Sequence, residues 1–175
     1  MRDESRQGQN LSGLAQIERA TWRDVRVLTR LDKRCFRPID AFGWFEFLGL
    51  CLWPSVITLK AMADGRIVGF IAGDPRRRAG HTVIVTLGVD PDYQGRGVGE
   101  RLMREVEVRS PLPRFRLMVR KSNARAINLY RKLDYQIVDS WPHYYGDGEA
   151  AYVMEKTSPP PPSPEVEQRT SGERE

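Results

Sequence analysis

The residues with the clearest chemical meaning form a glycine-rich loop, Gln94-Gly95-Arg96-Gly97-Val98-Gly99, shortly after a β-branched run that ends at Val89. Glycine has no Cβ, so the backbone of such a loop can approach an anion closely. The first N–H groups of a helix have no partner within that helix and attract phosphate groups. Because an amphipathic segment comes next, we expect the loop to open a helix and to cradle a pyrophosphate, with Arg96 adding a positive charge.

Phosphate-binding loops of different classes carry different residues after their glycines. A nucleoside-triphosphate loop requires Gly-Lys-Ser/Thr, whereas this chain has Glu100-Arg101-Leu102. A dinucleotide-binding loop requires an acidic residue after the next strand, but the run from Phe115 to Val119 ends in Arg120-Lys121. The sequence therefore disfavours both, and the loop alone leaves an ordinary glycine turn before a helix as an alternative.

The loop resembles the Gln/Arg-x-x-Gly-x-Gly/Ala motif of the GCN5-related N-acetyltransferase (GNAT) superfamily at every fixed position. Residues 119–130, Val-Arg-Lys-Ser-Asn-Ala-Arg-Ala-Ile-Asn-Leu-Tyr, resemble the second acetyl-CoA motif of that superfamily. Residues 143–154 resemble the Tyr-Tyr hairpin of the subgroup that acetylates protein N-termini, which includes the RimI-type ribosomal-protein alanine acetyltransferases. The resemblance extends from about Ile17 to Lys156, and three motifs in the same order are far more specific than one.

The resemblance implies acetyl-CoA as a co-substrate and a sheet whose fourth and fifth strands splay apart to hold the pantetheine arm. The cofactor would contact the end of the fourth strand, the glycine-rich loop and the helix after the fifth strand. The residues assigned to it in this way are Leu87, Gly88, Val89, Gln94, Gly95, Arg96, Gly97, Val98, Gly99, Glu100, Asn123, Ala126 and Tyr130.

Acetyl transfer from a thioester to an amine needs a proton for the departing thiolate, and a tyrosine hydroxyl can supply it. The resemblance gives this role to Tyr130. It also places Tyr144 and Tyr145 along the acceptor cleft, and we assign Asp40 to the acceptor site as well. Packing within a hairpin is the alternative for the two neighbouring tyrosines, because aromatic residues favour strands.

The sequence departs from the RimI-type pattern at the general base. Those enzymes carry Glu, and relatives carry His, five residues before the position of Asn123, whereas this chain has Met118. The fourth strand offers no carboxylate in its place. Either another carboxylate accepts the proton, with Asp40, Glu46 and Asp147 as candidates, or water does.

A site without a strong base favours α-amines over lysine. An α-amine with a pKa of ~7.8 is roughly one third neutral near neutral pH, whereas a lysine amine with a pKa of ~10.4 is about 0.1% neutral. We therefore expect the acceptor to be the N-terminal α-amine of a protein or peptide, with a ribosomal protein as one candidate. Two alternatives stay open, namely acetylation of a small-molecule amine and a non-catalytic domain that binds acyl-CoA as a sensor or partner module.

The elements that must position these residues can be predicted from the hydrophobic pattern. A capping box at residues 21–24 predicts a first helix, interrupted at residues 37–40, and the pair Asp64-Gly65 predicts a hairpin turn. Further helices are predicted at 41–53, 97–109 and 123–133, and strands at 16–20, 55–62, 66–73, 81–89, 114–120, 135–144 and 150–156. This order predicts an α/β (α+β) fold of the GNAT type, a mixed central sheet of about seven strands flanked by four helices.

Length and composition predict one acetyltransferase domain at residues 14–156. The chain has 175 residues, of which 40% are hydrophobic, and this is enough for one core. The polar segments 1–13 and 157–175, the second with a proline run, predict disordered tails. The net charge of +5 suits an anionic cofactor, and we expect no direct contact with nucleic acid.

The start of the chain and its cysteines predict where the protein resides. Met1-Arg2-Asp3-Glu4 does not resemble a signal peptide, and the longest apolar stretch, residues 41–53, falls short of the roughly 20 residues of a membrane span. We expect a cytoplasmic protein without membrane contact, as a monomer or a weak dimer. Cys35 and Cys51 are expected to be reduced thiols in or near the core. Two histidines and two cysteines without metal-ligand spacing predict no metal site.

Overall fold

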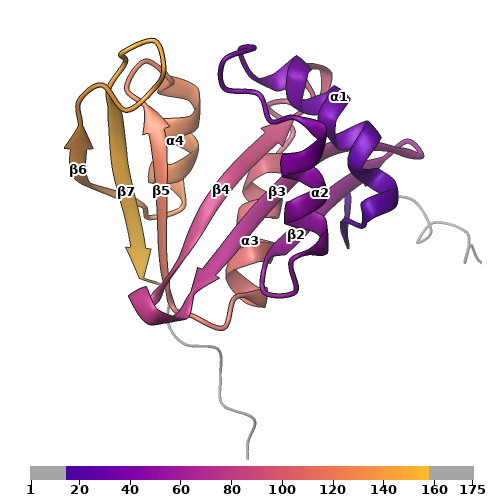
Figure 1. The fold of residues 1–175 in the computed structure, drawn as a ribbon, viewed down its shortest axis with the longest axis horizontal. Coiled ribbons are helices and arrows are strands. Elements are labelled where there is room, and N and C mark those ends of the chain that lie inside the picture. Colours follow the sequence, from indigo (N-terminus) through magenta and orange to yellow (C-terminus); the bar gives the residue numbers. More distant parts are fainter. Residues whose placement is uncertain (1–14, 158–175) are drawn as a thin grey trace, which may run out of the picture.

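The computed structural model describes residues 15–157, which form one mixed sheet with helices on both faces (Figure 1). The strands lie in the order β1-β2-β3-β4-β5-β7-β6. Their bounds are β1 (Gln16–Arg19), β2 (Ile57–Ala63), β3 (Arg66–Arg76), β4 (His81–Val89), β5 (Arg114–Arg120), β6 (Gln136–Trp141) and β7 (Ala151–Thr157). The predicted fold class is confirmed.

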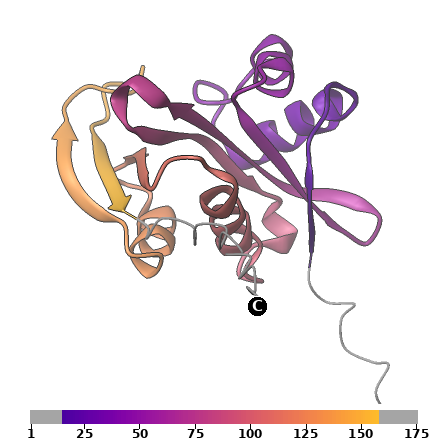
Figure 2. The same ribbon diagram turned by 90° about the horizontal axis from the view of Figure 1, so that it is seen from below.

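Four α-helices cover the sheet. They are α1 (Val25–Cys35), α2 (Trp44–Leu52), α3 (Val98–Arg109) and α4 (Ala124–Lys132), and short 3-10 turns lie at Trp22–Asp24, Arg77–Ala79 and Pro91–Tyr93. Helices α1 and α2 pack on one face of the sheet, and α3 and α4 pack on the other (Figure 2). Leu102 and Val106 of α3 and Ile127 of α4 are buried in the larger core, as predicted.

The feature that creates room for a site is the divergence of β4 from β5. These parallel strands pair only at Thr82 with Phe115 and Val83 with Arg116. Farther along β4, the register with β3 shifts so that Val85 is an extra residue, a β-bulge. A bulge bends its strand, and the two strands form a V whose wide end lies at the top of Figure 1. The predicted splay of the fourth and fifth strands is confirmed.

Helix α2 is shorter than its apolar sequence predicts. The helix begins at Trp44 because Gly43 takes an extended conformation, and the backbone N–H of Phe42 donates to the Asp32 carboxylate at 2.7 Å instead. Phe47 is the buried residue of this helix, whereas Phe45 is 80% exposed. The apolar character of the segment therefore contributes less to the core than the sequence indicates.

The strand predicted at residues 135–144 also ends early, at Trp141. His143 adopts a left-handed conformation with a φ of 52°, which takes the chain out of the strand. The loop then closes through the backbone N–H of Tyr145, which donates to the carbonyl of Glu149 at 3.1 Å. Tyr144 and Tyr145 thus lie in a loop between β6 and β7. The expected place of Tyr144 at the end of a strand is wrong, whereas Tyr145 was predicted to follow that strand.

The predicted tails lie outside the described residues, apart from Thr157, which is the last residue of β7. No helix within residues 15–157 has the length and apolar character needed to cross a membrane.

Candidate active site

The glycine-rich loop and the first turn of α3 present a row of free backbone donors. Gly95 and Gly97 have φ values of 79° and 78°, in the left-handed region that glycine adopts without strain. The first backbone bond of α3 runs from Arg101 N to Gly97 O at 3.0 Å. Among the described residues, the N–H groups of positions 95–100 find no acceptor, so they are available to an anion.

Two contacts hold this loop in place. The side chain of Gln94 donates from Nε2 to the carbonyl of Val89 at 2.9 Å and so ties the loop to the end of β4. Gly99 lies against α4, where an added Cβ would come within 3.2 Å of Leu129. Gly95 and Gly97 therefore shape the turn, and Gly99 allows α3 to approach α4 closely.

A cleft of about 470 Å³ runs along this loop, between the end of β4 and the start of α4. Every residue assigned to the cofactor from the sequence lines it except Arg96. The residues that the structure brings together here are Leu87, Gly88, Val89, Gln94, Gly95, Gly97, Val98, Gly99, Glu100, Asn123, Ala126 and Tyr130.

The positive charges of this cleft differ from the one expected. The guanidinium of Arg96 lies 4.8 Å from the ring centre of Tyr93 and does not line the cleft. Arg125 and Lys132, both of α4, line it instead, and Arg125 donates a hydrogen bond to Gln94 Oε1. Sequence reasoning missed both, although Arg125 lies two residues after the motif asparagine.

Cys35 is a further lining residue that the sequence did not reveal. Its Sγ donates to the carbonyl of Val89 at 3.3 Å. Burial raises the pKa of the thiol to about 12, so it stays protonated at neutral pH. A protonated thiol is a poor nucleophile, and this contact therefore supports the end of β4 and does not point to covalent chemistry.

Tyr130 lies where the first cleft meets a second one of about 340 Å³. Its side chain is 8% exposed and packs 6.0 Å from the ring of Tyr135. Burial raises the pKa of the Tyr130 hydroxyl well above its usual value, so the group is neutral at neutral pH. Asn123 caps α4, because its Oδ1 accepts from the N–H of Ala126 at 3.1 Å.

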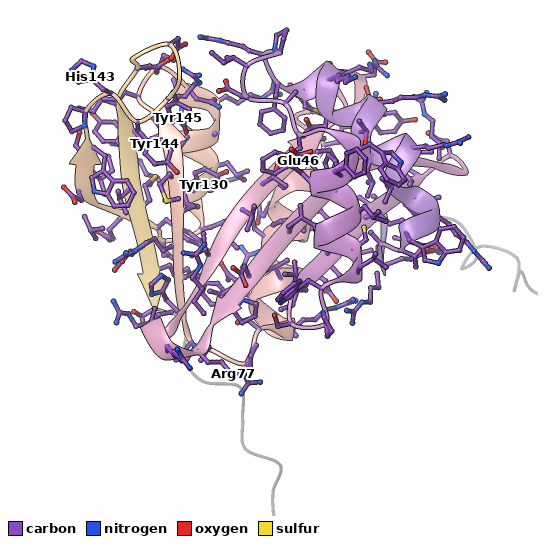
Figure 3. The ribbon with its side chains drawn as sticks, in the orientation of Figure 1. Glu46, Arg77, Tyr130, His143, Tyr144 and Tyr145 are labelled. Carbon is purple, nitrogen blue, oxygen red and sulfur yellow. The ribbon has the colours of Figure 1, made fainter. Side chains whose placement is uncertain are left out.

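The second cleft contains the residues assigned to the acceptor. Asp40, Tyr144 and Tyr145 line it, together with Met118 from β5. Figure 3 shows Tyr144 and Tyr145 in the β6–β7 loop, on the same side of the molecule as Tyr130. The two clefts share Phe36, Leu87, Asn123, Ala126 and Tyr130.

The carboxylates considered as bases are either occupied or distant. Asp40 and Asp147 both pair with Arg120, at 2.7 and 2.9 Å. The hydrogen bonds from Arg120 lower the pKa of Asp147, which weakens it as a base. Glu46 lies on α2, away from Tyr130, and lines neither cleft (Figure 3). None of these three carboxylates is therefore an unpaired group in the second cleft.

Comparisons with known proteins agree with the fold and with the motifs. The acetyltransferase (GNAT) family matches residues 17–135. The N-alpha-acetyltransferase RimI of Mycobacterium tuberculosis is 39% identical over 154 residues, which cover 78% of this chain and 94% of that protein. The N-alpha-acetyltransferase daf-31 of Caenorhabditis elegans is 32% identical over 121 residues, or 64% of this chain. Across daf-31 and two bacterial acetyltransferases, the chain spans only 58% to 66% of the relatives' length.

A solved structure shares the same architecture. The ribosomal-protein-S18-alanine N-acetyltransferase of Escherichia coli superposes with a TM-score of 0.73 over 86% of this chain and 98% of that one. The identity is 23%, so this likeness concerns the fold. The match across residues 17–135 and the similarity to the mycobacterial protein show that this chain belongs to the acetyltransferase (GNAT) family.

Proposed function

We propose that this protein transfers an acetyl group from acetyl-CoA to the N-terminal α-amine of a protein or peptide. The observation that carries the proposal is the junction of the two clefts at Tyr130, where a thioester from one cleft and an amine from the other reach the same hydroxyl. Relatives that are named N-alpha-acetyltransferases support the choice of acceptor.

The first cleft accommodates the cofactor by backbone chemistry. The free N–H groups of positions 95–100 hold the pyrophosphate, and Arg125 and Lys132 add positive charge beside it. The pantetheine arm lies along Leu87 to Val89, where β4 has left its pairing with β5. The thioester then reaches the junction of the clefts.

The reaction needs few groups from the protein. The neutral amine attacks the thioester carbonyl, the new C–N bond forms and the C–S bond breaks. The amine gives up its proton to water, and the departing thiolate takes a proton from the Tyr130 hydroxyl, which solvent then restores. Met118 offers no base, so an amine that is already neutral is favoured over lysine, by about 4 kcal/mol of deprotonation cost.

The partner and the location belong to the same proposal. A ribosomal protein is one candidate acceptor, because an enzyme of similar fold is named for ribosomal protein S18. We place the reaction in the cytoplasm and expect the enzyme to act as a monomer or a weak dimer, without a metal ion.

Steady-state assays of thiol release test the proposal. Peptides that begin with Ala or Ser should be acetylated faster than N-blocked copies that carry a lysine. Faster acetylation of lysine would contradict the choice of acceptor, and faster turnover of a small amine would favour a small-molecule substrate. Binding of acetyl-CoA without turnover on any amine would favour a sensor or partner module.

A further inference from the structure

A buried arginine at the end of β5 joins segments that are far apart in the sequence. The Arg120 side chain is 9% exposed, and its guanidinium donates to Asp40 through two hydrogen bonds of 2.7 and 2.9 Å. Its Nη1 also lies 2.9 Å from Asp147 Oδ2 and 2.7 Å from Glu149 Oε2. Each of the three guanidinium nitrogens thus has a carboxylate partner, and bidentate pairs of this kind fix geometry as well as charge.

The segments that meet at Arg120 are the α1–α2 loop, with Asp40, and the β6–β7 loop, with Asp147 and Glu149. They also touch each other directly, because Arg37 pairs with Asp147 at 3.1 Å. A Cβ added to Gly146 would lie 3.1 Å from Ile39, so side chain and backbone are in contact there too. This junction lies at the wide end of the V formed by β4 and β5 (Figure 1).

The same arginine orients the aromatic wall of the acceptor cleft. Its guanidinium carbon lies 3.9 Å from the ring centre of Tyr145, and the ring of Tyr144 packs edge-on against Tyr145 at 5.1 Å. Asp40, Tyr144 and Tyr145 all line the second cleft. The positions of Asp40, Tyr144 and Tyr145 in this cleft therefore depend on the side chain of Arg120.

The hydrogen bonds of this cluster favour the charged forms of Arg120, Asp147 and Glu149. Hydrogen bonds from Ser122 and Arg120 lower the pKa of Glu149 to about 2, and the bonds to its carboxylate partners raise that of Arg120 above its usual value. Three carboxylates face two guanidinium groups, those of Arg120 and Arg37. The ion pairs are therefore made within the cluster and hold its segments together.

We propose that Arg120 is a positioning residue for the acceptor: it clamps the α1–α2 loop and the β6–β7 loop together and so sets the width of the cleft that receives the peptide. The inference rests on the proposed function, because it names what the second cleft needs in order to bind a peptide N-terminus. Within the described chain, the glycine-rich loop at residues 94–100 makes none of these contacts, so the clamp acts mainly on the acceptor site.

The test is the substitution Arg120→Met, with Arg116→Met as the matched control. Arg116 lies on the same strand and pairs with Glu155 of β7 at 2.5 Å, but it lines neither cleft. For R120M, the KM for the peptide should rise about 10- to 100-fold, because a displacement of the cleft residues by about 1 Å has effects of this size. Its kcat should stay within about threefold, because the clamp would stabilise the bound peptide and the transition state equally. Its Kd for acetyl-CoA should stay within about twofold. R116M should keep both constants of the wild type.

A second variant keeps the inference testable if R120M does not fold. Asp147→Asn removes one ion pair to Arg120 and the pair to Arg37 while Asp40 and Glu149 remain. In D147N, amide hydrogen exchange should become faster in residues 36–43 and 143–150 and stay unchanged in residues 94–100. Exchange that stays unchanged in both loops would overturn the proposal.

The outcomes separate the clamp from the reaction. A wild-type KM for the peptide in R120M, or an equal rise in R116M, would show that Arg120 does not position the acceptor. A drop in kcat at unchanged KM would assign it a chemical role instead. If the wild-type protein acetylates no α-amine at all, the proposed function fails, and hydrogen exchange in D147N still decides whether the clamp exists.

Discussion

At the scale of single residues, the chemistry assigned to this site depends on a tyrosine that is shielded from water. Tyr130 lies between the two clefts, and burial raises its pKa well above the usual value. A hydroxyl of this kind stays protonated at any pH the enzyme would meet. It therefore carries the proton that a departing thiolate needs and cannot serve as a base for the amine, although the raised pKa makes it a weaker acid than an exposed tyrosine.

Replacement of Tyr130 by Phe removes the proton donor and leaves the ring in place. We expect kcat to fall by about 100-fold, which is the lower range for the loss of a general acid. The Kd for acetyl-CoA, measured by calorimetry, should stay close to that of the wild type because the hydroxyl is a small part of the cleft. A kcat near that of the wild type would remove Tyr130 from the mechanism.

The pH profile tests the absence of a base. With Met118 in the cleft, the free amine is the group that must lose a proton, so kcat/KM for an Ala-starting peptide should rise with pH and level off above about 8. The raised pKa of Tyr130 predicts no decline up to at least about pH 10. A rising limb centred near about pH 6 would instead indicate a protein carboxylate or histidine as the base.

At the scale of elements, local sequence determined much of the framework but not the connections within the site. The bounds predicted for β4 and β5 agree with the structure, because both strands are uninterrupted runs between turn residues. The predicted ends of α2 and β6 were wrong, because a buried carboxylate and a left-handed histidine decide them. The partners of Arg120 lie 80, 27 and 29 residues away, a proximity that no local pattern shows.

The glycine-rich loop is a part of the candidate site that could be predicted from the sequence. Its glycines predicted a close approach to phosphate, and the structure adds that Gly97 has a φ of 78° with no neighbour around an added Cβ. Gly97→Ala should therefore destabilise the fold by about 1–2 kcal/mol through backbone strain alone. It should also weaken acetyl-CoA binding, because relief of the strain moves the N–H groups of the first turn of α3.

Gly65→Ala is the matched control for that prediction. Gly65 also has a positive φ, 71°, and open space around an added Cβ, but it lies in the β2–β3 turn. Urea unfolding should show a similar loss of stability in both variants, while calorimetry should show weaker acetyl-CoA binding in G97A alone. Equal affinities in G97A and the wild type would argue against the loop as the pyrophosphate site.

At the scale of the whole molecule, the free energy of unfolding depends on a buried carboxylate outside both clefts. Asp32 of α1 is 1% exposed and accepts the backbone N–H of Phe42 at 2.7 Å. Burial outweighs this hydrogen bond and raises the pKa of Asp32 to about 6. The native state therefore holds a proton that the unfolded chain releases near about pH 4, and native stability falls as that proton is lost.

The resulting pH dependence has a definite sign. Because the native pKa is raised, the contribution of Asp32 is fully present below about pH 4 and is lost as pH rises through about 6, a change on the order of 3 kcal/mol. Asp32→Asn carries no charge at any pH and still offers an acceptor to Phe42. The difference in unfolding free energy between D32N and the wild type should therefore shift in favour of D32N between about pH 4 and about pH 7.

Asp24→Asn should show the opposite trend and serves as the control. Burial alone would raise the pKa of Asp24, but hydrogen bonds from Lys60 and Thr21 lower it below the usual value. Its contribution is thus present at neutral pH and is lost as pH falls through that lowered pKa. Urea unfolding of both variants at about pH 3, 4.5, 6 and 7.5 separates the two signs, because the D24N difference should change only below about pH 4 and the D32N difference only above it. A D32N difference that does not change with pH would show that the Asp32 carboxylate is not desolvated in the fold.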